Sequence, residues 1–219
     1  VFALLGGLVV DFGASADLFI ALVKYSATVI VGLLLMIFVV YPIILKIFTK
    51  MKYKDFFKGI MPAQMLAFST SSSAATLPVT MERCEDHLGV SEEVSSFVLP
   101  LGATINMDGT SLYQAVAAVF IAQAYSMDLD MGQQLTIVLT ATLASIGAAA
   151  VPGAGMVMLV IVLGAIGVPT EGLALIFGVD RILDMLRTVV NVTGDATVAT
   201  VVAATEGQLR VVSEEELMS

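Results

Sequence analysis

Residues 173–204 read LALIFGVDRILDMLRTVVNVTGDATVATVVAA, an apolar segment that carries polar side chains at helical spacing. Five of these polar residues are separated by four, three, four and four positions: Asp180, Asp184, Arg187, Asn191 and Asp195. At 3.6 residues per turn, all five fall inside an arc of roughly 80°. We therefore predict one helix with a narrow polar face and an apolar surface around the rest.

The environment of this polar face follows from the composition of the whole chain. Of the 219 residues, 58% are hydrophobic and 13% are charged, whereas soluble domains average about 25% charged residues. We therefore favour a membrane helix over the alternative, a cytosolic helix with a solvated charged face. A charge at the bilayer centre costs roughly 2.5–3.5 kcal/mol, against roughly 0.3–0.6 kcal/mol gained per Leu or Val. The four ionisable groups must then contact each other, water or a bound solute.

Simple counts exclude or disfavour several classes of protein. The single cysteine, Cys84, excludes an internal disulfide and a cysteine metal cluster. No basic patch with interleaved aromatic residues suggests nucleic acid as a partner. The net charge of −9 lies largely in short polar connections and in the tail at Glu214–Glu216. Because the chain starts with Val1 inside an apolar run, without Met or a basic start, we expect a fragment that lacks its N-terminal part.

Five apolar segments divide the chain, and a helix needs about 20 residues to cross the hydrocarbon core. The segments are Val1–Val10, Leu18–Phe48, Phe97–Tyr125, Gln134–Val168 and Leu173–Ala204. Five lysines gather in one connection: Lys46, Lys50, Lys52, Lys54 and Lys58. The positive-inside rule places this connection in the cytoplasm. We expect a multi-pass protein of the cell membrane, embedded in the lipid bilayer, with the C-terminus also in the cytoplasm.

Two segments are unusual for membrane-spanning helices. Residues 67–80 read AFSTSSSAATLPVT and residues 143–156 read LASIGAAAVPGAGM, so each has a middle of small residues and a nearby proline. Ser and Gly are poor helix formers, and Pro removes a backbone donor. In hydrocarbon, an irregular backbone survives only inside protein or along a cavity. We predict two re-entrant hairpins; the alternative is a pair of kinked spans or a small-residue packing face.

Each predicted hairpin is followed by an apolar segment that carries polar residues. The first precedes the NMDGT sequence at 106–110, and the second precedes the Asp180–Asp195 face. With the lysine connection in the cytoplasm, the first hairpin opens to the cytoplasm and the second opens outside, after the loop at 126–132. This arrangement is an inverted repeat, which is typical of alternating access around a site at mid-membrane.

The residues around Asp108 favour a cation site. On a regular helix Asn106 and Thr110 share a face, while Asp108 points about 160° away. Gly102 and Gly109 favour a break in this helix. An unwound turn frees carbonyl oxygens that, with Asp108 and Asn106, are hard ligands suited to a small cation. Alternatively, a buried Asp108 caps the end of a broken helix.

Charge balance indicates cations and an amino acid as ligands. The charges expected inside the membrane are those of Arg187, Asp108, Asp180, Asp184 and Asp195. They sum to about −3, which is too much to bury uncompensated. Arg187 can hold a carboxylate through two hydrogen bonds, and Asp184, one turn away, suits an ammonium group. Helix N-termini near 71–73 and 153–155 offer N–H groups to another carboxylate. The alternative for Arg187 is an internal ion pair with Asp184 and no ligand.

Four motifs, in order along the chain, closely resemble those of the glutamate transporter family, the dicarboxylate/amino acid:cation symporters. They are SSSAATLP from Ser71, LGATINMDGT from Leu101, ASIGAAAVPGAG from Ala144 and DMLRTVVNVTGD from Asp184. The resemblance covers residues 1–207. It implies an all-α membrane fold with two re-entrant hairpins, partly unwound transmembrane helices and an inverted repeat. It also implies a sodium-coupled symporter of aspartate or glutamate, not an enzyme, which works by elevator-type alternating access and forms a homotrimer when full length.

The same resemblance divides the chain into seven segments. They are the end of a scaffold transmembrane helix with its loop (1–15), a transmembrane helix (16–50), re-entrant hairpin 1 (51–90), a transmembrane helix with the NMDGT break (91–126), re-entrant hairpin 2 (127–168), the substrate-binding transmembrane helix (169–207) and a cytoplasmic tail (208–219).

The resemblance also implies which residues bind substrate and sodium. Arg187 would hold the side-chain carboxylate of the substrate, and Asp184 its amino group. The other implied substrate contacts are Ser72, Ser73, Thr110, Val151, Gly155, Thr188 and Asn191. A first Na⁺ site would use Asp195 with carbonyl groups of Gly102, Asn106 and Asn191. A second would use carbonyl groups of Thr104, Ser145, Ile146 and Ala148, near Met107. A third would use Asp108 and Asn106.

Single residues bear on the choice among relatives. Dicarboxylate carriers of the family generally lack an aspartate at the position of Asp184, so we favour an amino acid as the substrate. The acidic residue Asp195 favours sodium over protons as the coupled ion. The alternatives are a C4-dicarboxylate or neutral amino acid symporter of the same fold, and an ion channel lined by the acidic face. An intramembrane hydrolase using Ser71–Ser73 would lack a nearby His or Lys base. We expect His87, in a polar connection, to lie at the surface.

Overall fold

The computed structural model describes residues 16–210, and this part of the chain is almost entirely helical. The helices are α2 (Ala16–Leu35), η1 (Met36–Val40), α3 (Tyr41–Phe48), α4 (Tyr53–Thr70), α5 (Ser73–Glu82), η2 (Arg83–His87), α6 (Glu92–Ile105), α7 (Asp108–Ala124), α8 (Met131–Ile146), α9 (Ala154–Ala165), η3 (Thr170–Gly172) and α10 (Leu173–Thr205). One isolated antiparallel bridge joins Val90 to Leu209. The all-α prediction is confirmed for residues 16–210. The predictions for 1–15, and for 211–219 of the tail, lie outside the described residues.

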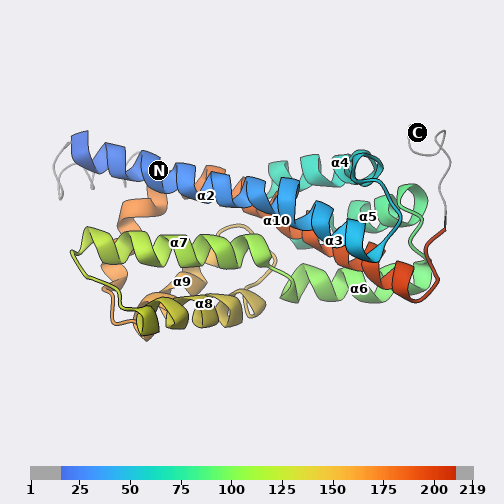
Figure 1. Cartoon of the computed structure of the whole chain (residues 1–219). Coiled ribbons are helices and arrows are strands. Elements are labelled where there is room, and N and C mark those ends of the chain that lie inside the picture. The colour runs from blue at the N-terminus through green and yellow to red at the C-terminus, as the bar shows by residue number, and fades with distance from the viewer. Residues whose placement is uncertain (1–15, 211–219) are drawn as a thin grey trace.

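α10 runs along the length of the molecule and contacts helices on several sides (Figure 1). Towards one end, α2, α7, α8 and α9 form an apolar cluster with its first half, around residues such as Tyr113. Towards the other end, α3, α4 and α6 pack on its second half, around residues such as Phe56. Along α10, the buried residues of the first cluster extend to Val190 and those of the second begin at Val192, within the predicted polar stretch. The polar face is therefore held between two apolar packing units.

α2, η1 and α3 form one continuous helix. Its residues Phe19–Phe48 are long and apolar enough to cross a membrane, and in the described range this is the one helix that meets both conditions. Large apolar side chains remain exposed along it, among them Phe19, Phe38 and Ile47. Such a surface is typical of a helix that contacts lipid or another apolar partner.

The π-helical turn η1 keeps one side of this helix buried. Its buried side chains recur every four residues: Tyr25, Val29, Leu33, Ile37, Tyr41 and Leu45. A regular α-helix turns about 100° per residue, so Tyr41 would point about 160° away from Tyr25. The wider turn of η1 winds less per residue. Tyr41 therefore still faces the interior, where it reaches α7 and α10.

Two pairs of helices carry turns that approach the middle of α10. α4 packs on α5, and the two join at Ser71 and Ser72. Ser71 has a left-handed φ of 52°, and Ser72 caps α5 by accepting a hydrogen bond from the Ala75 amide at 3.1 Å. α8 packs on α9, and they join through residues 147–153, which end at Gly153 with a φ of 78°. Both joins lie in the segments whose small residues predicted an interrupted helix.

Candidate functional site

The polar face of α10 is buried. Asp180, Asp184, Arg187, Asn191 and Asp195 all lie in the interior, and Arg187 is 1% exposed. The predicted helix and its single polar face are confirmed, because α10 is continuous across all five positions. The alternative of a solvated charged face is wrong for this part of the chain.

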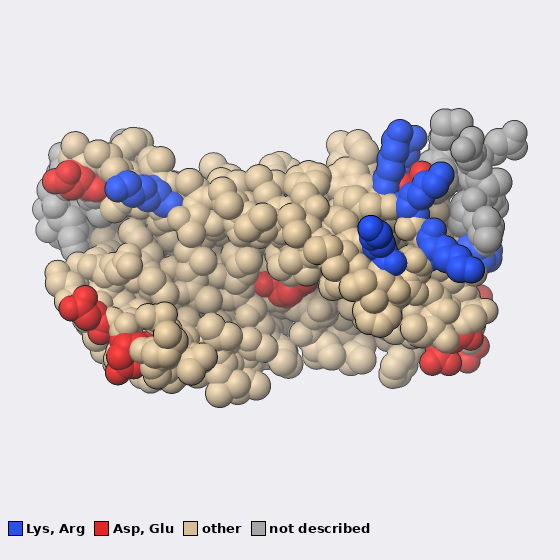
Figure 2. Space-filling model, viewed as in Figure 1, with Lys and Arg blue, Asp and Glu red and all other residues tan. Residues whose placement is uncertain are grey.

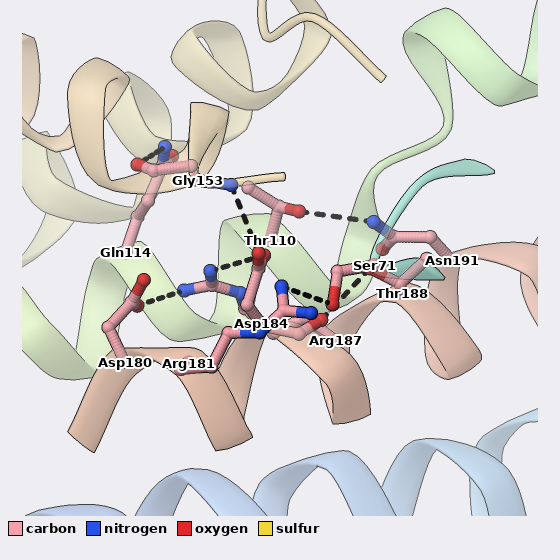
Figure 3. A network of polar contacts seen from close by, with 11 residues as sticks. Ser71, Thr110, Gln114, Gly153, Asp180, Arg181, Asp184, Arg187, Thr188 and Asn191 are labelled. Atoms are coloured by element: carbon pink, nitrogen blue, oxygen red, sulfur yellow. Dashed lines mark hydrogen bonds and ion pairs between the residues drawn. The ribbon is translucent and has the colours of Figure 1, made fainter. Parts of the chain in front are cut away.

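The Arg187 guanidinium is held by two carboxylates, which Figure 3 shows, and it also contacts an aromatic ring. Its Nη1 lies 3.0 Å from an Asp180 oxygen, and its Nη2 lies 2.6 Å from an Asp184 oxygen. Its Cζ lies 3.7 Å from the centre of the Tyr113 ring. The internal ion pair that the sequence left open as an alternative is thus formed, with Asp180 as a second partner. Removing one partner from a buried ion pair typically costs about 3–5 kcal/mol.

The turn between α8 and α9 closes over this ion pair. The Gly153 amide donates to Asp184 Oδ2 at 3.0 Å, and Gln114 Nε2 donates to the Gly155 carbonyl at 2.9 Å. The turn approaches α7 and α10 closely at Gly155, where an added Cβ would lie 3.0 Å from Thr110 Cγ2 and 3.7 Å from Arg187 Cζ. The predicted contacts Gly155, Thr110 and Arg187 are therefore brought together.

The turn between α4 and α5 meets the α8–α9 turn directly. Ser72 Oγ donates to the Ala150 carbonyl at 2.7 Å. From the other side, Arg181 Nη1 donates to Ser71 Oγ at 3.0 Å (Figure 3). Ser72 and Ser73 are both buried, whereas the Val151 side chain is 53% exposed. Any contact of Val151 with a solute in the interior would then involve its backbone.

The remaining predicted substrate residues join α7 to α10. The Asn191 side chain accepts from the Gly109 amide at 2.9 Å and donates to Thr110 Oγ1 at 3.1 Å. Thr188 Oγ1 donates to the Asp184 carbonyl within α10 at 2.9 Å. These bonds place Thr110, Thr188 and Asn191 on the same side of α10 as Asp184.

The predicted break in the NMDGT segment is confirmed. α6 ends at Ile105 and α7 begins at Asp108, and the two residues between have non-helical backbones: Asn106 with φ −96° and ψ 72°, Met107 with φ −109° and ψ 56°. Asn106 Nδ2 donates to Asp195 Oδ1 at 2.9 Å. A Cβ on Gly102 would lie 2.7 Å from the same Asp195 oxygen, so only glycine fits there without a shift. Gly102, Asn106 and Asp195 are thus neighbours, and the Gly102 carbonyl accepts from the Asn106 amide at 2.8 Å.

Asp108 has a partner that the sequence did not indicate. Its carboxylate accepts from the Tyr41 hydroxyl and, at 3.0 Å, from the Gly109 amide. The Tyr41 hydroxyl also lies 3.1 Å from the Val190 carbonyl. Asp108 is the first residue of α7, so this bond satisfies one free amide of the first turn, while the N-cap residue itself, Met107, makes no side-chain capping bond.

The residues implied for the second sodium site lie partly around one cavity of about 430 Å³. The cavity is lined by Asn106 and Met107 from the break and by Ser145 and Ile146 from the end of α8. Thr104 and Ala148 are not among its lining residues. The Ser145 carbonyl accepts from the Ala148 amide at 3.1 Å, so that oxygen has a partner within the turn.

One residue of the polar connection, His87, differs from expectation. His87 is buried, at 7% exposure, and not at the surface as predicted. Cys84 is also fully buried, and burial raises the pKa of its thiol. The cause is η2, which continues α5 as a π-helical turn and packs on α4 and α5, so the connection is folded into the protein.

Several site residues were missed by sequence reasoning. Asp180 was on the polar face but was not paired with Arg187. Tyr113 and Gln114 lie three and four residues after Thr110, so helical spacing from the break could have found them. Tyr41 gave no such signal, because it reaches Asp108 only through the altered winding at η1.

Buried ionisable side chains in an otherwise apolar helical protein are typical of membrane proteins that move charged solutes. The chain belongs to the sodium:dicarboxylate symporter family, whose model matches residues 1–205. The family resemblance seen in the four motifs is thereby confirmed.

Three relatives show the degree of similarity. The chain is 53% identical over 172 residues to excitatory amino acid transporter 2 of Mus musculus, over 78% of this chain and 30% of the relative. It is 50% identical over 181 residues to excitatory amino acid transporter 1 of Rattus norvegicus, over 83% of this chain and 33% of the relative. It is 47% identical over 202 residues to an excitatory amino acid transporter of Caenorhabditis elegans, over 92% of this chain and 40% of the relative. The chain thus spans less than half the length of these relatives.

Proposed function

We propose that this chain is the solute- and ion-binding part of a sodium-coupled symporter of acidic amino acids, aspartate or glutamate. The observation that carries the proposal is the buried Arg187, which lies between Asp180 and Asp184 beneath the meeting point of two helical turns. The names of the relatives, excitatory amino acid transporters, support the same substrate class. The family description supports sodium as the coupled ion.

The ion pair suggests how a zwitterion with a second carboxylate is bound. A substrate carboxylate replaces Asp184 on the Arg187 guanidinium, and the freed Asp184 carboxylate then accepts the substrate ammonium group. Each buried charge keeps a partner of opposite sign, so no uncompensated ion is left in the interior. Thr110, Thr188 and Asn191 lie beside this exchange. Ser72, Ser73 and the backbone near Val151 and Gly155 would hold the second carboxylate.

Bound sodium ions neutralise the negative charges of the remaining buried carboxylates. The first site uses Asp195 with Gly102, Asn106 and Asn191, and its support is the contact of Asp195 with Asn106 and Gly102. The second uses the carbonyl groups of Thr104, Ser145, Ile146 and Ala148 near Met107. The third uses Asp108 and Asn106. These are hard oxygen donors suited to a small cation.

The arrangement in the membrane follows from the lysine connection. With Lys46–Lys58 and the C-terminus in the cytoplasm, α4–α5 and α8–α9 form re-entrant hairpins that enter from opposite sides, as an inverted repeat requires. The turn between α8 and α9 acts as the outer gate. The full-length protein is a homotrimer in the cell membrane, in which this part moves as an elevator against a scaffold.

The test is uptake of radiolabelled aspartate into proteoliposomes that contain the full-length protein. We expect accumulation above the external concentration only with an inward sodium gradient. Uptake that persists unchanged without sodium would overturn the mechanism. Uptake of succinate or of alanine in preference to aspartate would instead favour a dicarboxylate or neutral amino acid carrier. Equilibration without accumulation would favour a channel.

A further inference from the structure

A basic cavity of about 590 Å³ lies where α3 ends and α4 begins, at the opposite end of the molecule from the α7–α8 connection (Figure 1). Three basic residues line it, Lys50, Lys52 and Arg210, against one acidic residue, Asp55. Arg210 is fixed in place, because its Nη2 donates to the Asp86 carbonyl at 2.9 Å. The cavity therefore carries a net positive charge.

In the part of the chain that the structure describes, the lysines around this cavity form no ion pair with a carboxylate. Figure 2 shows basic side chains gathered at this end, next to a surface of uncharged residues. Within residues 16–210, neither Lys50 nor Lys52 forms an ion pair, and both are exposed. α4 begins at Tyr53, so the partial positive charge of its N-terminus adds to theirs. The cavity is thus suited to an anion.

An apolar wall lies beside these charges. Ile47 and Phe48, the last residues of the helix that can cross a membrane, line the same cavity and are 67% and 54% exposed. A soluble anion would gain nothing from such a wall. A lipid has both parts, a charged headgroup and acyl chains that begin at the same depth as the end of a spanning helix.

We propose that this cavity binds the headgroup of an anionic phospholipid. Lys50 and Lys52 contact its phosphate groups, and Ile47 and Phe48 contact the first methylenes of its acyl chains. The lysine connection faces the cytoplasm in the proposed orientation, and the cytoplasmic leaflet is where anionic lipids are enriched. The site is separate from Arg187 and depends on no assignment of substrate or coupled ion.

The test is a binding titration, so it does not require transport. Purified full-length protein in detergent is titrated with fluorescent phosphatidylinositol 4,5-bisphosphate, and anisotropy gives the affinity. Lys50→Gln with Lys52→Gln should weaken binding roughly tenfold or more, since each lysine near an anionic headgroup contributes to affinity. The charge-preserving pair Lys50→Arg with Lys52→Arg should bind as the unmodified protein does.

The matched control is Lys54→Gln with Lys58→Gln. It removes the same charge from the same connection, and both lysines are exposed but do not line the cavity. We expect less than a twofold change. Equal weakening by the two Gln pairs would show diffuse attraction and overturn the site, as would no weakening by the first pair. Soluble inositol 1,4,5-trisphosphate should compete at least tenfold less well than the lipid, and equal competition would overturn the assignment to a lipid.

Discussion

Arg187 concentrates three interactions on one guanidinium, with Asp180, with Asp184 and with the Tyr113 ring. Arg187→Cys removes the cation that an acidic substrate needs. Losing one member of a buried charge pair costs about 2–5 kcal/mol, so aspartate affinity should fall roughly 30-fold to 5,000-fold. Uptake of a neutral amino acid should survive in part, because Asp184 can still accept an ammonium group. Competition of radiolabelled substrates in proteoliposomes measures both.

Arg83→Cys is the matched control for this variant. Arg83 is half-buried and donates to the Gly59 carbonyl at 2.7 Å, away from the α10 polar face. We expect its aspartate affinity to stay within twofold of the unmodified protein. An Arg187→Cys protein with unchanged aspartate affinity would remove Arg187 from the substrate site.

Asp184→Ser tests the ammonium contact by comparing two substrates. The serine cannot balance an ammonium charge, so amino acid binding should weaken at least tenfold. Succinate, which has the carboxylates but no ammonium, should lose less, and the ratio of the two affinities is the measurement. Equal losses for aspartate and succinate would contradict the role of Asp184.

The polar face of α10 could be predicted from the sequence, because the spacing of its residues along one helix determines which side chains share a face. Asp180 to Asp195 share one face in any regular helix, and the apolar composition of the chain favoured a buried environment for that face. The partners of that face could not be predicted in the same way. Tyr41 and Tyr113 come from α3 and α7, and the sequence does not state which neighbouring helix turns which side chain towards α10.

At the scale of the element, α6 contacts α10 where Gly102 meets Asp195. Gly102→Ala places a methyl group 2.7 Å from the Asp195 oxygen, which must then move. Because alanine forms helices better than glycine, the substitution should not weaken α6 itself. Its effect should come from displacement of the Asp195 carboxylate. We expect the sodium concentration for half-maximal uptake to rise about tenfold.

Gly164→Ala in α9 is the matched control, because the added methyl group meets no atom within 4 Å apart from the adjacent backbone of its own helix. Its sodium dependence should not change. If both alanine variants alter the sodium dependence equally, the effect does not come from Asp195, and the first sodium site would lose its support.

The interruptions of the helices followed from composition. Ser71–Ser73, Gly153 and the NMDGT segment each combine poor helix formers in an apolar context, and the chain leaves the helix at all three. The two π-helical turns could not be predicted from composition. η1 reads MIFVV and is followed closely by Pro42, whose missing N–H disturbs the helix there, but a proline does not by itself specify a π-helical turn. η2 reads RCEDH and carries no comparable signal, so its winding depends on tertiary packing. The burial of His87 was missed for this reason.

At the scale of the whole molecule, two turns that lie 78 positions apart in the chain meet through Ser72 and Ala150. If transport requires the turns to separate, linking them should stop it. Ser72→Cys with Ala150→Cys in the full-length protein should lose at least 90% of sodium-driven uptake after mild oxidation and regain it after reduction. Each single cysteine variant is the control, and Cys84 does not interfere because it is buried. Full uptake by a verified cross-linked protein would exclude separation of the turns.

The gap at Asn106 and Met107 has a mechanical consequence for the molecule. It separates α6 from α7. The C-terminal carbonyl groups of α6 and the N-terminal amide groups of α7 both face this break. An ion bound between these two helix ends would restrict the angle between α6 and α7, and its release would let that angle vary. Spin labels on the outer ends of α6 and α7 in the full-length protein should therefore give a narrower distance distribution with sodium than without. Since α8 packs on both α6 and α7, a fixed angle between these helices would also hold α8 and the turn that covers Arg187.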